Sequence, residues 1–393
     1  MLKKVLAILA CLAVCVYIFV GVSKKISHNE CVNVYDWYGV LPREVIEQFQ
    51  EETGIKVHYD VFDNNEILEA KLLASNSGYD VVFPTATPYA ARHKELGIYQ
   101  RLDKTQLPNL KFDDIYDFLK EKMQKIDPGL DFLLPLYWGT TGIAFNEDVL
   151  NELIPNHPKD GYSLLFDGET VEKLQSKGIS FLQEAIDVFP QILTYIGLDR
   201  EGTDFQSLEQ AAAFFSKICY KVRRFSSSRF ITDLIFGDVC VAQAWSGEAL
   251  RAIDEAEKIG QNIKYIIPKE GGDLWIDVAA IPIGAPHPKN AHIFINFLLR
   301  PEIGAQITNQ SRVTTMMKGS RKHIDPDIVS NTIIFPPDDV LRKLNFCSPP
   351  SKETDMYEKV RSRVWTLLKI SQTPKEADKY KLVFESLNIA DHK

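Results

Sequence analysis

The sequence predicts an α/β protein built from two lobes, and two observations carry this prediction. Near the N-terminus, strand-like and helix-like stretches alternate with short connections, which is typical of a parallel sheet with helices on its faces. Two extended passages, residues 133–146 and 264–282, enclose a central block of helices and strands and predict a second lobe inserted into the first. The alternating stretches are a strand at 32–37, a helix at 42–54, a strand at 55–62, a helix at 64–78 and a strand at 79–85.

The extended passages also predict where the chain changes lobe. Each lobe is expected to hold a mostly parallel sheet flanked by helices, joined to the other by two crossing strands that act as a hinge near 138–142 and 268–273. The predicted divisions are an N-terminal segment at 1–30, a first lobe at 31–138, a second lobe at 139–268, and a return to the first lobe with C-terminal helices at 269–393.

Composition bounds the size of the protein and excludes one class of partner. The chain has 393 residues, of which 45% are hydrophobic and 25% are charged, and this is enough for two lobes with sizeable cores. The net charge is −8, and the body of the chain has no run of Lys or Arg beside aromatic residues. A nucleic-acid partner therefore has no electrostatic support, whereas a small cationic ligand is compatible with the charge.

The N-terminal segment predicts export. An uncharged stretch from Val5 to Val22 follows MLKK and precedes a polar segment, as in an export signal or a membrane anchor. Gly21 and Ser23 supply a cleavage pattern of small residues, and the sequence leaves cleavage and retention both open. The folded body is expected to lie outside the cytoplasmic membrane, with contact to the membrane where the segment is retained.

Four cysteines remain after this segment: Cys31, Cys219, Cys240 and Cys347. Their wide spacing does not fit a metal site, and we expect neither a metal nor a cofactor. One or two disulfides suit an oxidising compartment, and four buried free thiols are the alternative.

Three tryptophans stand beside acids at predicted strand ends. In GGDLWIDVAAIP, strand alternation places Trp275 and Asp277 together on the face opposite the apolar residues. Trp245 precedes Glu248 by three residues, and Trp37 ends the first strand. An alkylammonium ion suits such pairs, because the carboxylate meets its charge and the aromatic face meets its CH₂ groups. The alternative for each pair is a core tryptophan beside a solvated acid.

Two further features place polar groups at candidate ligand positions. Ligands of parallel sheets lie beyond the carboxyl ends of the strands, where Trp37, Tyr38 and Thr85 fall. If a helix opens within residues 180–193, Glu184 and Asp187 share one of its faces and repel each other unless a cation lies between them. Acids in a first helical turn also favour the helix dipole, which explains this pair with no ligand.

Enzyme motifs are absent from the sequence. The eight histidines are scattered, and no zinc-protease, nucleophile-elbow or phosphate-loop pattern occurs. A glycosidase could use two of these carboxylates, but nothing in the sequence fixes their separation. We therefore expect a binding protein without catalytic residues.

Six stretches in register resemble one family, the bacterial spermidine/putrescine-binding periplasmic proteins of ABC transporters. The resemblance implies a two-lobed, type II periplasmic-binding fold that holds a polyamine in the cleft between the lobes. It also implies a periplasmic, monomeric receptor that works with a membrane permease and its ATPase. The stretches are YDWYGVLPREVIEQFQEETGIKV, YDVVFPT, LPLYWGTTGIAFN, GDVCVAQAWSGEA, PKEGGDLWIDVAAIP and INFLLRPE.

The resemblance assigns roles to nearly all the candidate residues. It implies that the acids meet ligand amines, with Glu184 typical of spermidine-type members and Glu248 of putrescine-type members, so both polyamines stay open. Thr85 takes the place of a hydroxyl residue in the loop after the third strand. The residues that match aromatic walls are Trp37, Trp245 and Trp275, and those that match acids are Asp187, Asp277, Glu184 and Glu248.

The chain also departs from the family. After Trp37 the family has Ser or Thr, an acid and often Tyr, whereas this chain has Tyr38, Gly39 and Val40, and Arg312 falls near a family Tyr. Two alternatives stay open beside polyamine import. One is the same fold with another small organic cation or solute, and the other is a membrane-anchored ligand sensor.

Overall fold

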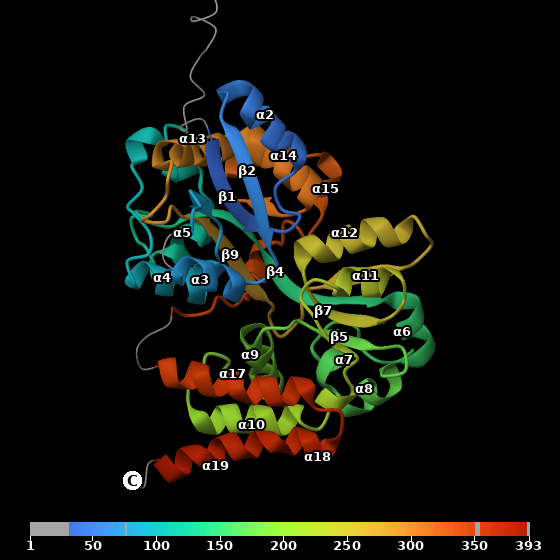
Figure 1. Ribbon diagram of the computed structural model, residues 1–393. Helices are drawn as coiled ribbons and strands as arrows, with labels where there is room; N and C mark the ends of the chain where they lie inside the picture. The colour runs from blue at the N-terminus through green and yellow to red at the C-terminus, as the bar shows by residue number, and fades with distance from the viewer. Residues whose placement is uncertain (1–30, 75–76, 350–353, 391–393) are drawn as a thin grey trace, which may run out of the picture.

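The first lobe is built on a short parallel sheet (Figure 1). The computed structural model describes residues 31–74, 77–349 and 354–390, so the predicted export segment lies outside the described residues. The strand order is β2-β1-β3, and all seven residues of β1 pair with β2 in parallel. The elements are β1 (Cys31–Trp37), α2 (Arg43–Thr53), β2 (Lys56–Phe62), α3 (Asn65–Leu73), β3 (Val81–Val82), α4 (Ala91–Glu95) and α5 (Asp117–Met123).

The local sequence explains these boundaries. Val45 and Phe49 lie one turn apart on α2 and are both buried, so the helix is held against the sheet by a single apolar stripe. It ends at Gly54, which adopts a φ of +72° at little steric cost. Asn64 accepts a hydrogen bond from the backbone N–H of Ile67 and begins α3. The predicted alternation of strands and helices is thereby confirmed.

The strand β4 (Leu134–Asn146) runs through both lobes and is buried along its whole length. Its first part pairs antiparallel with β9 (Asp273–Ala279) and β10 (Thr314–Thr315), and its last part pairs with β7 (Val241–Trp245) and β8 (Ile263–Ile266). Isolated bridges join β9 to the segment around β3. Two long strands thus pass between the lobes, and their action as a hinge stays a prediction.

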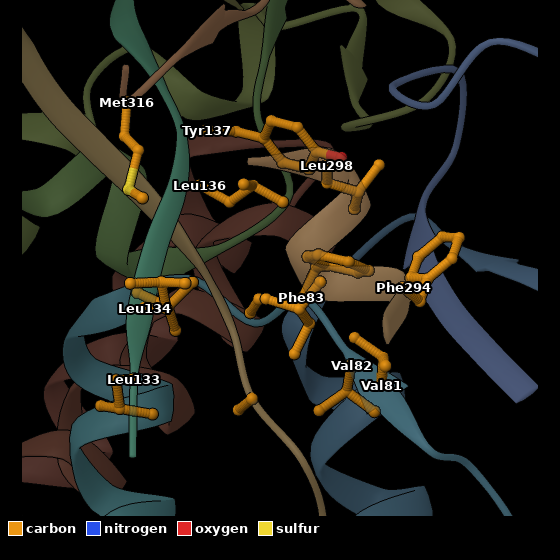
Figure 2. Close-up of a cluster of buried hydrophobic side chains, with 14 of the residues drawn as sticks. Val81, Val82, Phe83, Leu133, Leu134, Leu136, Tyr137, Phe294, Leu298 and Met316 are labelled. Carbon is orange, nitrogen blue, oxygen red and sulfur yellow. The ribbon is translucent and has the colours of Figure 1, made fainter. Parts of the chain in front are cut away.

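Part of the core of the first lobe lies between the strand β4 and the helix α13 (Pro288–Leu298). Each large apolar side chain buried there contributes about 1.5–3 kcal/mol. Figure 2 shows part of this core, with the labelled residues Val81, Val82, Phe83, Leu133, Leu134, Leu136, Tyr137, Phe294, Leu298 and Met316.

The strands of the second lobe continue the seven-stranded sheet that contains β4, β9 and β10, and this lobe has its own core. β5 (Ile179–Phe181) is parallel to both β6 (Arg224–Phe225) and β7, whereas β4 runs antiparallel to its neighbours. Leu165, Phe181 and Phe215 are among the residues that fill the core. The helices of this lobe are α6 (Glu147–Leu153), α7 (Ser163–Phe166), α8 (Gly168–Leu174), α9 (Ala185–Tyr195), α10 (Phe205–Phe215), α11 (Phe230–Ile235) and α12 (Ser246–Glu257).

The C-terminal part of the chain, after β9, contributes helices to both lobes. α13 and α14 (Pro301–Ser311) pack on the first lobe, where Phe49 and Phe294 stack edge to face with centroids 5.0 Å apart. The chain then crosses a third time, and α17 (Asp355–Ile370) packs on the second lobe beside α10 (Figure 1). The remaining helices are α15 (Pro326–Ser330), α16 (Asp338–Leu341), α18 (Pro374–Ala377) and α19 (Lys381–Ala390).

Among the helices that the structure describes, none combines the length and the apolar character needed to cross a bilayer.

Candidate functional site

A cavity lies between the two lobes. Its volume of about 210 Å³ is below the ~300–1,000 Å³ of pockets for drug-sized ligands, so the cavity suits a small solute. Its walls include the end of β1, the loop after β3, the start of α9, the start of α12 and β9. Eight of the nine predicted site residues line it: Trp37, Thr85, Glu184, Asp187, Trp245, Glu248, Trp275 and Asp277.

The ninth predicted residue, Tyr38, is not among the lining residues. Its side chain is 72% exposed, and its backbone N–H donates to the carbonyl oxygen of Phe62 at 3.0 Å. The chain turns directly after Trp37, because the N–H of Val40 donates back to the carbonyl of Trp37. This turn leaves Trp37 and Val40 on the cavity wall and the Tyr38 side chain in solvent.

Asp277 is held in place by the opposite strand segment. The Thr85 hydroxyl group donates to its Oδ1 at 2.8 Å, and the Asn65 amide in turn donates to the Thr85 hydroxyl oxygen at 3.0 Å. Burial raises the pKa of Asp277 well above its ordinary value, and the charges of Asp36 and Glu248 raise it further, while the Thr85 bond lowers it. No Lys, Arg or His of the described residues forms an ion pair with this carboxylate. It is suited to a cationic ligand group.

The aromatic walls come from both lobes. The rings of Trp37 and Trp245 are 6.1 Å apart at an angle of 66°. Trp275 lies opposite Gly139 in the ladder between β9 and β4, and a Cβ atom at Gly139 would overlap the indole ring. The glycine therefore makes room for Trp275 at the cavity, as the predicted alternation of β9 requires.

Glu184 and Asp187 open the helix α9, as predicted. Glu184 is the N-cap residue and accepts a hydrogen bond from Ser227, and Asp187 lies in the first turn. Burial raises the pKa of Glu184 to about 7. Burial and the neighbouring charge of Glu184 raise the pKa of Asp187 well above its ordinary value. The helix dipole alone does not compensate these two charges, and a cation between them would lower both pKa values.

Glu248 differs from Glu184, Asp187 and Asp277 because it already forms an ion pair with a basic residue of the chain, Arg251. Arg251, one turn later on α12, donates to Glu248 at 3.1 Å and also to the carbonyl oxygen of Gly39 in the first lobe at 2.5 Å. Burial raises the pKa of Glu248, and the charge of Arg251 lowers it.

Several residues at or behind the cavity wall were not among the predicted site residues. Asp36 does not line the cavity; it is fully buried, burial raises its pKa to about 7, and its charge acts on Asp277. Its position inside the apolar strand YDW is a signal that could have identified it. Asn65 and Tyr89 line the cavity, and no pattern in the sequence distinguishes them. Arg200 lines it as well and forms an ion pair with Asp273 of β9.

The remaining sequence predictions concern cysteines, metals and one arginine. No disulfide joins the four cysteines, which are all free thiols: Cys31, Cys219, Cys240 and Cys347. Of these, only Cys219 and Cys240 are buried. The described residues contain no group of His, Cys, Asp or Glu that could hold a metal ion. Arg312 forms an ion pair with Asp254 at 2.8 Å and ends α14.

Two lobes joined by long strands, with a cavity of indoles and carboxylates between them, define a solute-binding protein of the type II periplasmic-binding fold. Comparisons with known proteins place the chain in the same class. The chain belongs to the family of bacterial extracellular solute-binding proteins, whose model matches residues 76–339. This is a family of binding proteins rather than enzymes.

Curated relatives and solved structures extend this likeness over most of the chain. It is 37% identical to the putrescine-binding periplasmic protein SpuD of Pseudomonas aeruginosa, over 87% of this chain and 93% of that protein. It is 36% identical to the putrescine-binding periplasmic protein PotF of Escherichia coli, over 89% of this chain and 94% of that protein. A putative spermidine/putrescine ABC transporter structure from Listeria monocytogenes is 26% identical with a TM-score of 0.76, covering 86% and 99% of the two chains.

Proposed function

We propose that this protein binds a polyamine, spermidine or putrescine, in the cavity between its lobes and delivers it to an ABC importer. The observation that carries the proposal is the arrangement of the lining acids. Asp277 and Glu248 influence each other at one wall, Glu184 and Asp187 do so at another, and three indole rings share the cavity with them. A chain with a cationic group at each end and CH₂ groups between them matches this pattern.

In this proposal the carboxylates pair with the ammonium groups of the ligand, and the indole rings pack against its methylene groups. Asp277 and Asp187 would each pair with an ammonium group, with Glu184 or Glu248 as a third partner. The methylene groups would lie against Trp37, Trp245 and Trp275, and each cation–π contact contributes about 0.5–2 kcal/mol. The raised pKa values of the acids support this assignment, because uncompensated buried carboxylates are stabilised by an incoming cation.

Binding would favour the closed arrangement of the lobes. A ligand that contacts residues of both lobes, such as Thr85 and Asp187, interacts more strongly when the lobes are together, and this shifts the equilibrium toward closure. The closed form would dock on the membrane permease, whose ATPase drives import. The names of the curated relatives, which describe periplasmic binding proteins, support a site of action outside the cytoplasmic membrane.

One observation favours a second candidate, a solute that carries an acceptor as well as a cation. The indole N–H of Trp275 is buried and has no hydrogen-bond partner among the described residues. An amino acid derivative with one ammonium and one carboxylate group would supply an acceptor for it.

A thermal unfolding screen separates the candidates. We expect putrescine, spermidine or spermine to raise the midpoint of unfolding in a concentration-dependent manner, because they bind the folded state alone. γ-Aminobutyrate, which has one ammonium and one carboxylate group, should have no effect. A rise with γ-aminobutyrate and none with any polyamine would reject the proposal in favour of the second candidate.

A further inference from the structure

Arg251 joins a carboxylate of the cavity, Glu248, to the loop after β1 in the opposite lobe. Its side chain is 25% exposed and that of Glu248 is 16% exposed, so the pair is shielded in part from water. Exposed pairs at this helical spacing contribute little and need no function. This pair differs from them because the guanidinium group also reaches the Gly39 carbonyl, from the second lobe to the first.

The loop that receives Arg251 is shaped for it. Gly39 has a φ of +76°, and the Cζ atom of Arg251 lies 3.2 Å from the place where a Cβ atom would stand. A side chain at this position would therefore displace the guanidinium group as well as strain the backbone.

The consequence concerns the charge of the cavity. Asp277 and Glu248 influence each other electrostatically, and Arg251 compensates the second of them. An ammonium group at this wall would therefore meet one free carboxylate, Asp277, and a nearby positive charge that opposes a second cation. Neither Glu184 nor Asp187 forms an ion pair with a Lys, Arg or His of the described part of the chain, and the charges of Lys369 and Arg361 act on them only from a longer distance.

We propose that Arg251 acts as an internal cation that occupies Glu248 and thereby limits the number of positive charges that the cavity accepts. The inference rests on the proposed polyamine function and adds a specificity-determining residue to it. Replacing Arg251 frees Glu248 for the ligand, and a ligand with three charges gains more from the freed carboxylate than a ligand with two.

The test is the ratio of the affinities for spermidine and putrescine, measured by calorimetry at pH 8. A ratio cancels any effect on lobe closure that both ligands share. In Arg251→Gln we expect the ratio to shift toward spermidine by roughly tenfold, the size of one charge-assisted hydrogen bond. Arg251→Lys keeps the charge and should keep the ratio of the wild-type protein.

Two controls isolate the contact with Glu248. The double variant Arg251→Gln, Glu248→Gln should return the ratio to the wild-type value. Lys258→Gln removes one positive charge from the end of the same helix, where Lys258 pairs with Glu255 at 2.6 Å, and should leave the ratio unchanged. Thermal unfolding verifies that each variant is folded.

The outcomes that overturn the inference are distinct from failure of the proposed function. Amines that bind with an unchanged ratio in Arg251→Gln overturn this inference alone, as does an equal shift in the double variant. A wild-type protein that binds neither amine overturns the proposed function and this inference with it.

Discussion

Thr85 donates its hydroxyl hydrogen to Oδ1 of Asp277 at 2.8 Å, although the two residues are 192 positions apart in the chain. The bond joins the loop after β3 to the strand β9 at the wall of the cavity. It fixes the orientation of the carboxylate at the cavity. Asn65 supports the arrangement through the Thr85 hydroxyl oxygen and backbone N–H.

Replacing Thr85 with Val removes this donor while preserving the shape of the side chain. We expect the affinity for putrescine to fall about tenfold, because the Asp277 carboxylate loses a hydrogen bond that orients it. Calorimetry measures the change. Thr308→Val is the matched control, since the Thr308 hydroxyl group is buried in α14 without a partner in the described residues and lies outside the cavity. Equal affinity in Thr85→Val and the wild-type protein would contradict the orienting role.

The ligand-free protein should lose stability as the pH rises through about 7. Burial raises the pKa of Glu184 from 4.5 to about 7, so the folded state binds more protons than the unfolded state between these values. This contribution to stability is complete below pH 4.5 and is lost as Glu184 ionises. Thermal unfolding between pH 5 and 8 measures the loss, which we expect to be about 2–4 °C for roughly 1 kcal/mol.

Glu184→Gln should reduce this dependence, since a neutral amide replaces the buried carboxyl group. The exposed residue Glu51, replaced by Gln, serves as the control. The same linkage predicts that an amine ligand releases protons when it binds at pH 7, which titrations in two buffers of different ionisation enthalpy can measure. Proton uptake on binding would contradict the assignment of Glu184 to the site.

Gly139→Ala should destabilise the protein by about 1–3 kcal/mol through overpacking against Trp275. The added Cβ atom would also approach the Ser246 hydroxyl oxygen at 2.7 Å, so the strand and the start of α12 would both have to shift. Urea denaturation measures the change. Gly168→Ala is the matched control, because a Cβ atom there meets nothing within 4 Å. If the two variants are equally stable, Gly139 does not make room for the indole.

The indole rings of the cavity should contribute to the affinity for a polyamine through cation–π contacts with the ligand. Trp245→Leu is expected to weaken polyamine binding about 3- to 30-fold, the loss of one cation–π contact. Trp138→Phe controls for the loss of a tryptophan, since Trp138 is buried in β4 away from the cavity lining. Titration of both variants with spermidine provides the comparison, and an unchanged affinity in Trp245→Leu would exclude that ring from the site.

Local patterns predicted the residues whose position follows from the strands. The alternation in GGDLWIDVAAIP placed Trp275 and Asp277 on one face of β9, and the structure has both on the cavity wall. Period-2 alternation needs no tertiary information. The ends of β1 and β3 carried Trp37 and Thr85 to the same edge for a similar reason.

The contacts that depend on two distant segments were not predictable. Arg251 meets Gly39 only because α12 and the loop after β1 approach each other across the lobes. Tyr38 was assigned to the site, yet the turn after Trp37 directs its side chain into solvent. The third crossing, which brings Phe346 and Cys347 to the cavity, has no signal in a Pro-rich loop sequence. Side-chain encounters of this kind arise from packing, which a single sequence does not specify.

Calorimetric titration of the wild-type protein and of Asp277→Asn with putrescine and spermidine tests whether the Asp277 carboxylate holds an ammonium group of the ligand. The substitution keeps the shape of the side chain and removes its charge. We expect saturable binding of one amine molecule by the wild-type protein and an affinity at least about 30-fold lower in Asp277→Asn, since a buried charge partner is lost. Absence of binding to the folded wild-type protein, or equal affinity in the two proteins, would contradict this expectation.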